Sequence, residues 1–69
     1  MNISYNRLWK LLVDKGMNKT KLKEVAGIST NAVAKLGRNE PVSMETLGKI
    51  CNGLNCEISD IVEFCPDVE

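Results

Sequence analysis

With 69 residues, the chain has room for one modest core and is too short for an enzyme with a deeply buried active site. Its nine basic and nine acidic side chains give a formal net charge of zero, which by itself argues against a nucleic-acid-binding protein. No run of about 18 apolar residues occurs, and the N-terminal sequence lacks a signal-peptide core, so we expect a cytoplasmic protein.

The first predicted helix begins at Ser4 or Asn6 and ends at Gly16, a residue that often follows the end of a helix. Its inward stripe consists of leucines at helical spacing: Leu8, Leu11 and Leu12. Trp9 and Val13 fall beside this stripe and widen the apolar surface. Two interpretations of Trp9 are open: it closes the core, or it contacts a second copy or another partner.

Residues 18–37 contain the most informative pattern. Asn18 is a suitable N-cap for a helix over 19–26, Gly27 supplies a left-handed turn, and Ser29 caps a further helix over 30–37. Two helices joined by so short a glycine-containing turn are typical of a helix-turn-helix, whose second helix can enter the major groove of DNA.

Two more helices are predicted towards the C-terminus. Glu40 and Pro41 mark a loop, Ser43 opens a fourth helix, and Gly53 and Asn55 end it. The inward stripe of this helix is Leu47, Ile50, Cys51 and Leu54. A short fifth helix is expected over 58–64, with Ile58, Ile61, Val62 and Phe64 as its apolar residues. Since no strand of useful length is indicated, we expect an all-α, compact five-helix domain over residues 1–69.

The charges are divided unevenly along the chain. Residues 1–38 hold eight basic and two acidic side chains, a balance of +6, and residues 39–69 hold one basic and seven acidic side chains, a balance of −6. This split suggests one face for phosphates and another turned away from them, although an ordinary solvated helix surface would also explain it.

A metal site is not indicated. The chain has no histidine and no CxxC pair, so its three cysteines, Cys51, Cys56 and Cys65, do not have zinc-ligand spacing. We expect reduced, buried thiols, with Cys65 the one most open to oxidation. No cofactor and no small-molecule ligand is predicted.

The chain resembles the lambda-repressor-like domains of the Cro and phage-repressor class. The resemblance lies in LWKLLVDKGM (8–17), KTKLKEVAGIS (19–29), NAVAKLGRNEPVSMETLGKIC (31–51) and LNCEISDIV (54–62). The turn and core positions that match are Gly27, Ile28, Ser29, Val33, Leu36, Leu47, Ile50, Leu54 and Ile61. Two departures concern an arginine and a glutamate that can pair in many relatives: Leu12 and Gly37 stand in their places here. Lys23 replaces a small alanine and has to extend outward.

The recognition residues follow from the docking of such a helix, because its N-terminal part enters the groove first. We expect the base-contacting residues to be Thr30, Asn31, Ala34 and Lys35. We expect the phosphate-contacting residues to be Lys19, Arg38, Asn39 and Ser43, of which the resemblance supports Arg38 and Asn39 in particular. Solvated, functionally neutral side chains would also explain Thr30, Asn31 and Lys35.

The predicted function is sequence-specific binding of double-stranded DNA by a small transcriptional regulator, a repressor, that inserts residues 30–37 into the major groove. The resemblance implies a homodimer on two half-sites. The alternative is a protein-interaction module on the same scaffold, such as an antitoxin or anti-regulator; the zero net charge, Trp9, and the small Ala32 and Ala34 favour it. No catalytic arrangement is present in the sequence, so we do not expect an enzyme.

Overall fold

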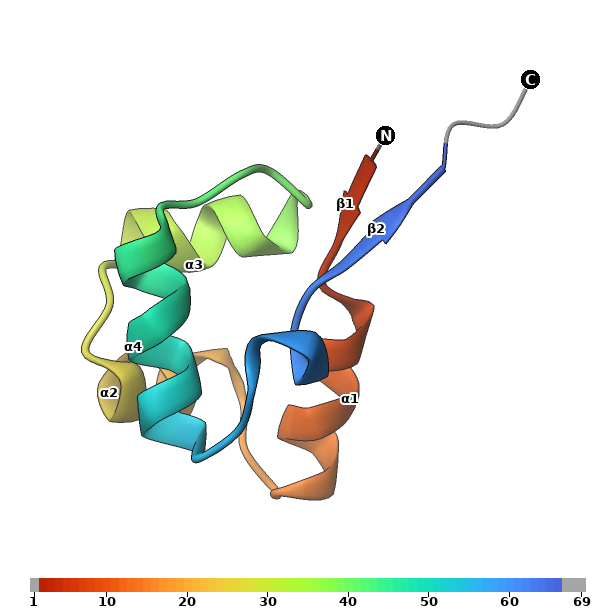
Figure 1. Cartoon of the computed structure of the whole chain (residues 1–69). Helices are drawn as coiled ribbons and strands as arrows, with labels where there is room; N and C mark the ends of the chain where they lie inside the picture. Colours follow the sequence, from red (N-terminus) through yellow and green to blue (C-terminus); the bar gives the residue numbers. More distant parts are fainter. Residues whose placement is uncertain (1, 67–69) are drawn as a thin grey trace.

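Four α-helices and two short strands make up the part of the chain that the computed structural model describes, residues 2–66 (Figure 1). The order of elements is β1 (Asn2–Ser4), α1 (Asn6–Asp14), α2 (Lys19–Ala26), α3 (Thr30–Gly37), α4 (Met44–Leu54), the 3₁₀ helix η1 (Ile58–Asp60) and β2 (Glu63–Cys65). β1 and β2 pair antiparallel, with Ile3 opposite Phe64. In Figure 1 this ribbon extends away from the helices.

The expected fifth helix over residues 58–64 is wrong: the described residues are mostly helical, but they form four α-helices and two short strands and not five helices. Only the single turn of η1 forms there, and the chain then enters β2. Ile61 is fully buried, but Ile58 is 43% exposed and Phe64 63% exposed, so the apolar spacing does not correspond to one inward face. The partner strand β1 lies at the other end of the chain, so the local apolar pattern carries no information about it.

Three of the helices, α2, α3 and α4, have their N-termini capped by the expected side chains. Asn18 Oδ1 accepts a hydrogen bond from the Lys21 backbone amide at 2.8 Å. The hydroxyls of Ser29 and Ser43 each accept a hydrogen bond at 3.1 Å from the backbone amide three residues further along the chain. Gly27 adopts a φ of 67°, in the left-handed region where glycine pays no steric penalty, and this turn connects α2 to α3. The helix-turn-helix pattern over 18–37 therefore forms.

The core lies between the helices and is built from leucine and isoleucine. Its fully buried aliphatic side chains are Leu8, Leu22, Leu36, Ile50, Leu54 and Ile61. The most extensive helix contact is between α2 and α4. Gly53 lies inside α4 at this contact, so it does not end the helix as expected; Asn55, with a φ of 54°, does. Because Gly53 has no side chain, α2 and α4 can approach each other closely at this point.

Trp9 is half-buried and packs against the core, as one of the two interpretations expects; a contact of its exposed part with a second copy or another partner stays a prediction. Among residues 2–66, Val13 and Met44 are the most exposed large apolar side chains, at 76% and 72%. The three cysteines are free thiols and all are half-buried, so Cys65 does not stand out from the other two. No helix within residues 2–66 has the length and apolar character that a membrane span requires.

Candidate nucleic-acid interface

The solvent-facing side of α3 carries the four residues predicted to contact bases. Thr30, Asn31 and Ala34 are exposed and Lys35 is half-buried. Residues four apart in a helix lie one above the other, so Asn31 and Lys35 form one column and Thr30 and Ala34 the next. Leu36, fully buried, anchors the opposite side of the helix in the core. The structure therefore brings all four residues onto one accessible face.

A hollow of about 230 Å³ lies between the N-terminal parts of α3 and α4. Asn31, Lys35, Ser43 and Thr46 are among the polar residues that line it, and Val42 is an apolar residue of its wall. Two capped helix starts meet here, each with backbone amides that favour anions. The arrangement combines a lysine, two helix N-termini and hydroxyl groups beside the exposed face of α3.

Two of the predicted phosphate contacts lie at helix starts. Lys19 is exposed at the first position of α2. Ser43 caps α4, and its hydroxyl also donates to Thr46 Oγ1 at 3.0 Å. Because the capping role already occupies the Ser43 hydroxyl, a phosphate here would meet the backbone amides of α4 more readily than the side chain.

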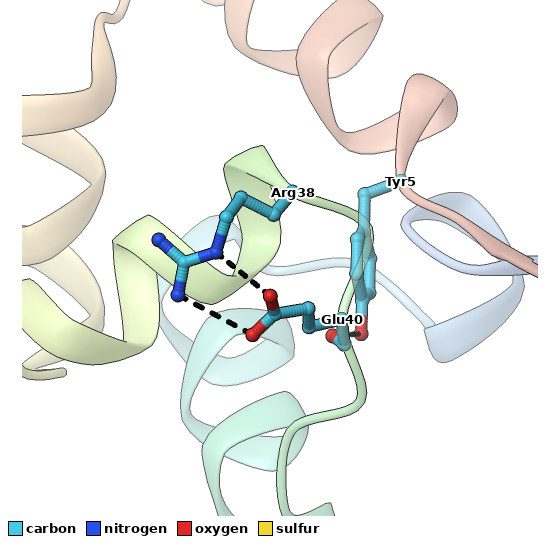
Figure 2. A network of polar contacts seen from close by, with 3 residues as sticks. All are labelled: Tyr5, Arg38 and Glu40. Carbon is cyan, nitrogen blue, oxygen red and sulfur yellow. Dashed lines mark hydrogen bonds and ion pairs between the residues drawn. The ribbon is translucent and has the colours of Figure 1, made fainter.

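The third phosphate candidate, Arg38, is engaged by a carboxylate. Arg38 Nε donates to Glu40 Oε2 at 2.8 Å, and Nη2 donates to Oε1 at 3.3 Å, a bidentate pair at the surface just beyond α3 (Figure 2). The hydrogen bond from Arg38 lowers the pKa of the Glu40 carboxyl, and Lys35 lowers it further. Glu40 thus competes with any phosphate for this guanidinium.

The fourth candidate, Asn39, has a structural role in the free protein. It adopts a φ of 55°, and its Oδ1 accepts a hydrogen bond from the Tyr5 backbone amide at 3.2 Å. The Tyr5 hydroxyl donates to the Glu40 carbonyl at 2.8 Å (Figure 2). These two bonds join the start of α1 to the loop after α3 and so fix where Arg38 and its neighbours lie.

We predict that Tyr5→Phe lowers the free energy of unfolding by about 1 kcal/mol, because the buried ring remains but its hydrogen bond to the Glu40 carbonyl is lost. Denaturant unfolding of both proteins at neutral pH measures this difference. An unchanged midpoint would show that water replaces the phenol at no cost.

Tyr5 also makes the free energy of unfolding depend on pH in the alkaline range. Burial raises the pKa of the phenol above its ordinary value of 10.0. The folded state therefore holds the phenol proton more tightly than the unfolded state. The contribution of Tyr5 to the free energy of unfolding is complete below pH 10 and is lost as the pH rises through the pKa of the folded state. Tyr5 is the only tyrosine, so tyrosinate absorbance should titrate at a higher pH in the folded chain than in denaturant.

The division of charge along the sequence becomes a division among elements. The basic half contains α1, α2 and α3, which include the helix-turn-helix, and the acidic half contains α4, η1 and β2. Lys23 is exposed, as expected for a lysine that extends outward. Among the described residues, no group of three or more histidine, cysteine, aspartate or glutamate side chains could hold a metal ion.

Sequence reasoning missed the residues that position this interface. Tyr5, Glu40 and Thr46 were not among its candidates, and each contacts a predicted site residue. The Arg38–Glu40 spacing of two residues in a loop gives a weak signal for an ion pair. No signal in the sequence indicated the role of Tyr5, because this residue lies more than thirty positions from its hydrogen-bond partners.

Comparison with known proteins agrees with this geometry. A model of the Cro/C1-type helix-turn-helix DNA-binding domain matches residues 7–67, so the chain belongs to that family. The crystal structure of the transcriptional regulator VanUg is similar, with a TM-score of 0.90 and 50% sequence identity over 96% of this chain and 88% of that one. No curated protein sequence matched the chain.

Proposed function

We propose that this protein is a sequence-specific transcriptional repressor that inserts α3 into the major groove of double-stranded DNA. The observation that carries the proposal is the accessible face of α3, which presents Thr30, Asn31, Ala34 and Lys35 together, while the opposite side of this capped helix is buried in the core. Membership of the Cro/C1-type family and the similarity to VanUg, itself a transcriptional regulator, support it.

Base recognition would follow from the chemistry of these side chains. The Asn31 carboxamide can bond to N6 and N7 of adenine, and the Lys35 ammonium can donate to O6 and N7 of guanine. Thr30 can bond to a base or meet a thymine methyl, and Ala34 allows close approach. In this arrangement Lys19, the α4 N-terminus near Ser43, and Arg38 with Asn39 would hold the phosphates on either side of the groove.

One chain offers a small base-reading surface, so we propose that a homodimer binds two half-sites about one turn of DNA apart. The whole of residues 1–69 would act as one domain in the cytoplasm. Repression would result from occupying an operator and excluding polymerase, with control through the concentration or degradation of the protein or through a partner.

Selection of bound sequences from a random duplex library tests the function directly. We expect enrichment of a motif with two-fold symmetry, preferred over random DNA by at least about 10³-fold, and an affinity that falls steeply as salt rises. The repressor proposal fails if selected and random duplexes bind equally at physiological salt. Specific binding to a protein partner that Lys35→Ala leaves intact would instead support the interaction module.

We predict that Glu40→Gln strengthens binding to any duplex several-fold, because it frees Arg38 for phosphate and removes a negative charge next to α3. The logarithmic salt slope should become steeper by up to about one. Asp14→Asn is the matched control: it makes the same charge change at the end of α1 that lies away from α3 in Figure 1. Equal gains in the two variants would show a general charge effect rather than release of Arg38.

A further inference from the structure

The ammonium group of Lys19 lies in a defined place between two helices. Its Nζ is 5.0 Å from the centroid of the Trp9 ring, which projects from α1. The same atom lies 3.5 Å from the point that a Cβ on Gly37 would occupy, at the end of α3. The two distances place the Lys19 ammonium against the Trp9 ring of α1 and close to the end of the recognition helix.

We infer that Trp9 is a positioning residue that holds Lys19 ready for a backbone phosphate. The inference rests on the proposed function, because it assigns a role within DNA binding. A cation over an indole face is attracted by the ring without losing its charge, so all three ammonium donors remain available. A lysine otherwise loses much rotamer freedom when it is immobilised, and the ring has already reduced that loss in the free protein.

Arg38 provides the contrast. Its partner is a carboxylate, which neutralises the charge and occupies two of the guanidinium donors. The two cations beside α3 are therefore held in different ways, Lys19 by an uncharged ring and Arg38 by an anion that has to be displaced. Among residues 2–66, Arg38 has an ion pair and Lys19 has none, so Lys19 can bind phosphate without giving up a carboxylate of that region.

Gly37 lies beside the ammonium at the C-terminal end of α3, where a Cβ would be in ordinary van der Waals contact with it. A cation at that end of a helix is favoured by the helix dipole. A carboxylate introduced here would reach Lys19 and hold it as Glu40 holds Arg38. Gly37→Glu should therefore weaken binding to random-sequence duplex DNA more than Gly37→Gln, which adds a similar side chain without charge.

The contact itself is tested in the free protein by NMR. A methylene next to an ammonium that sits over an indole is shifted upfield by the ring current, so the Lys19 side-chain protons should resonate upfield of those of the other lysines. Trp9→Leu should abolish the shift and Trp9→Phe should retain part of it. Ordinary lysine shifts in the wild-type chain would overturn the inference, and this measurement does not depend on any variant folding.

The role is tested by a double-mutant cycle on random-sequence duplex DNA, with Lys19→Met removing the charge while keeping an apolar stem. We expect Trp9→Leu to weaken binding about two- to fivefold when Lys19 is present and to have no effect in the Lys19→Met background. Equal losses in both backgrounds would overturn the positioning role and indicate a structural effect of Trp9. Val13→Ala, an exposed change on the same helix, is the control.

The failure of this inference is distinguishable from that of the proposed function. If the wild-type chain binds no duplex, the repressor proposal fails and the phosphate role of Lys19 fails with it. If the chain binds DNA but Lys19 shows ordinary shifts or no coupling to Trp9, only the positioning role of Trp9 is overturned.

Discussion

Gly53→Ala is expected to lower the stability of this domain strongly. A Cβ at residue 53 would lie 2.5 Å from the Val25 carbonyl oxygen, 2.9 Å from its carbon and 3.0 Å from the Ala26 Cα. All three are backbone atoms of α2, so relief requires α2 and α4 to move apart. We expect a net loss of about 2–3 kcal/mol, although alanine is the better helix former by about 1 kcal/mol.

Gly48→Ala is the matched control, because it makes the same change in the same helix. A Cβ there has no neighbour within 4 Å, so only the helix propensity should act, and the variant should be more stable by up to about 1 kcal/mol. Denaturant and thermal unfolding of both variants give the comparison. Similar midpoints for the two would mean that the α2–α4 contact adjusts readily to a methyl group.

Loss of an expected base contact should have the largest effect on DNA recognition. Lys35→Ala and Asn31→Ala are each expected to cost about 1–3 kcal/mol, or about five- to 150-fold in affinity, on the selected operator. Both should have a much smaller effect on random duplexes, because Asn31 carries no charge and Lys35 contributes one of several cations. Competition binding at fixed salt measures both ratios.

Lys21→Ala provides the control for charge. Lys21 is exposed on α2 and outside the predicted contacts, so its loss should weaken selected and random duplexes by the same small factor. If Lys35→Ala behaves like Lys21→Ala, Lys35 acts through its charge alone and the assignment of base recognition to it is wrong.

Several local features were predictable from neighbouring residues alone. Asn18, Ser29 and Ser43 each lie just before a helix and cap it within three residues, and Gly27 supplies a conformation that needs no distant partner. The accessible face of α3 was predictable for the same reason, since helical spacing places Asn31 opposite the buried side of the helix. Whether that face contacts DNA stays a prediction.

The features that escaped prediction depend on residues distant in sequence. β2 forms because β1 is available beside it as a pairing partner. The helical spacing of Ile58 and Ile61 does not reveal that strand pairing with β1 competes with a helix here. Gly53 looks like a helix end from its own neighbours, but in the folded chain it is the point where α4 meets the backbone of α2.

The surroundings of the predicted phosphate contacts show the same division between local and distant effects. The residue types alone place Lys19 and Arg38 on the basic half of the chain, because charge is a property of each side chain. What each of them contacts depends on packing: the Trp9 ring lies against Lys19, and the carboxylate of Glu40 holds Arg38. Caps, turns and helix faces are short-range properties of the chain, whereas helix approach, strand pairing and the partners of surface charges arise only when distant segments meet.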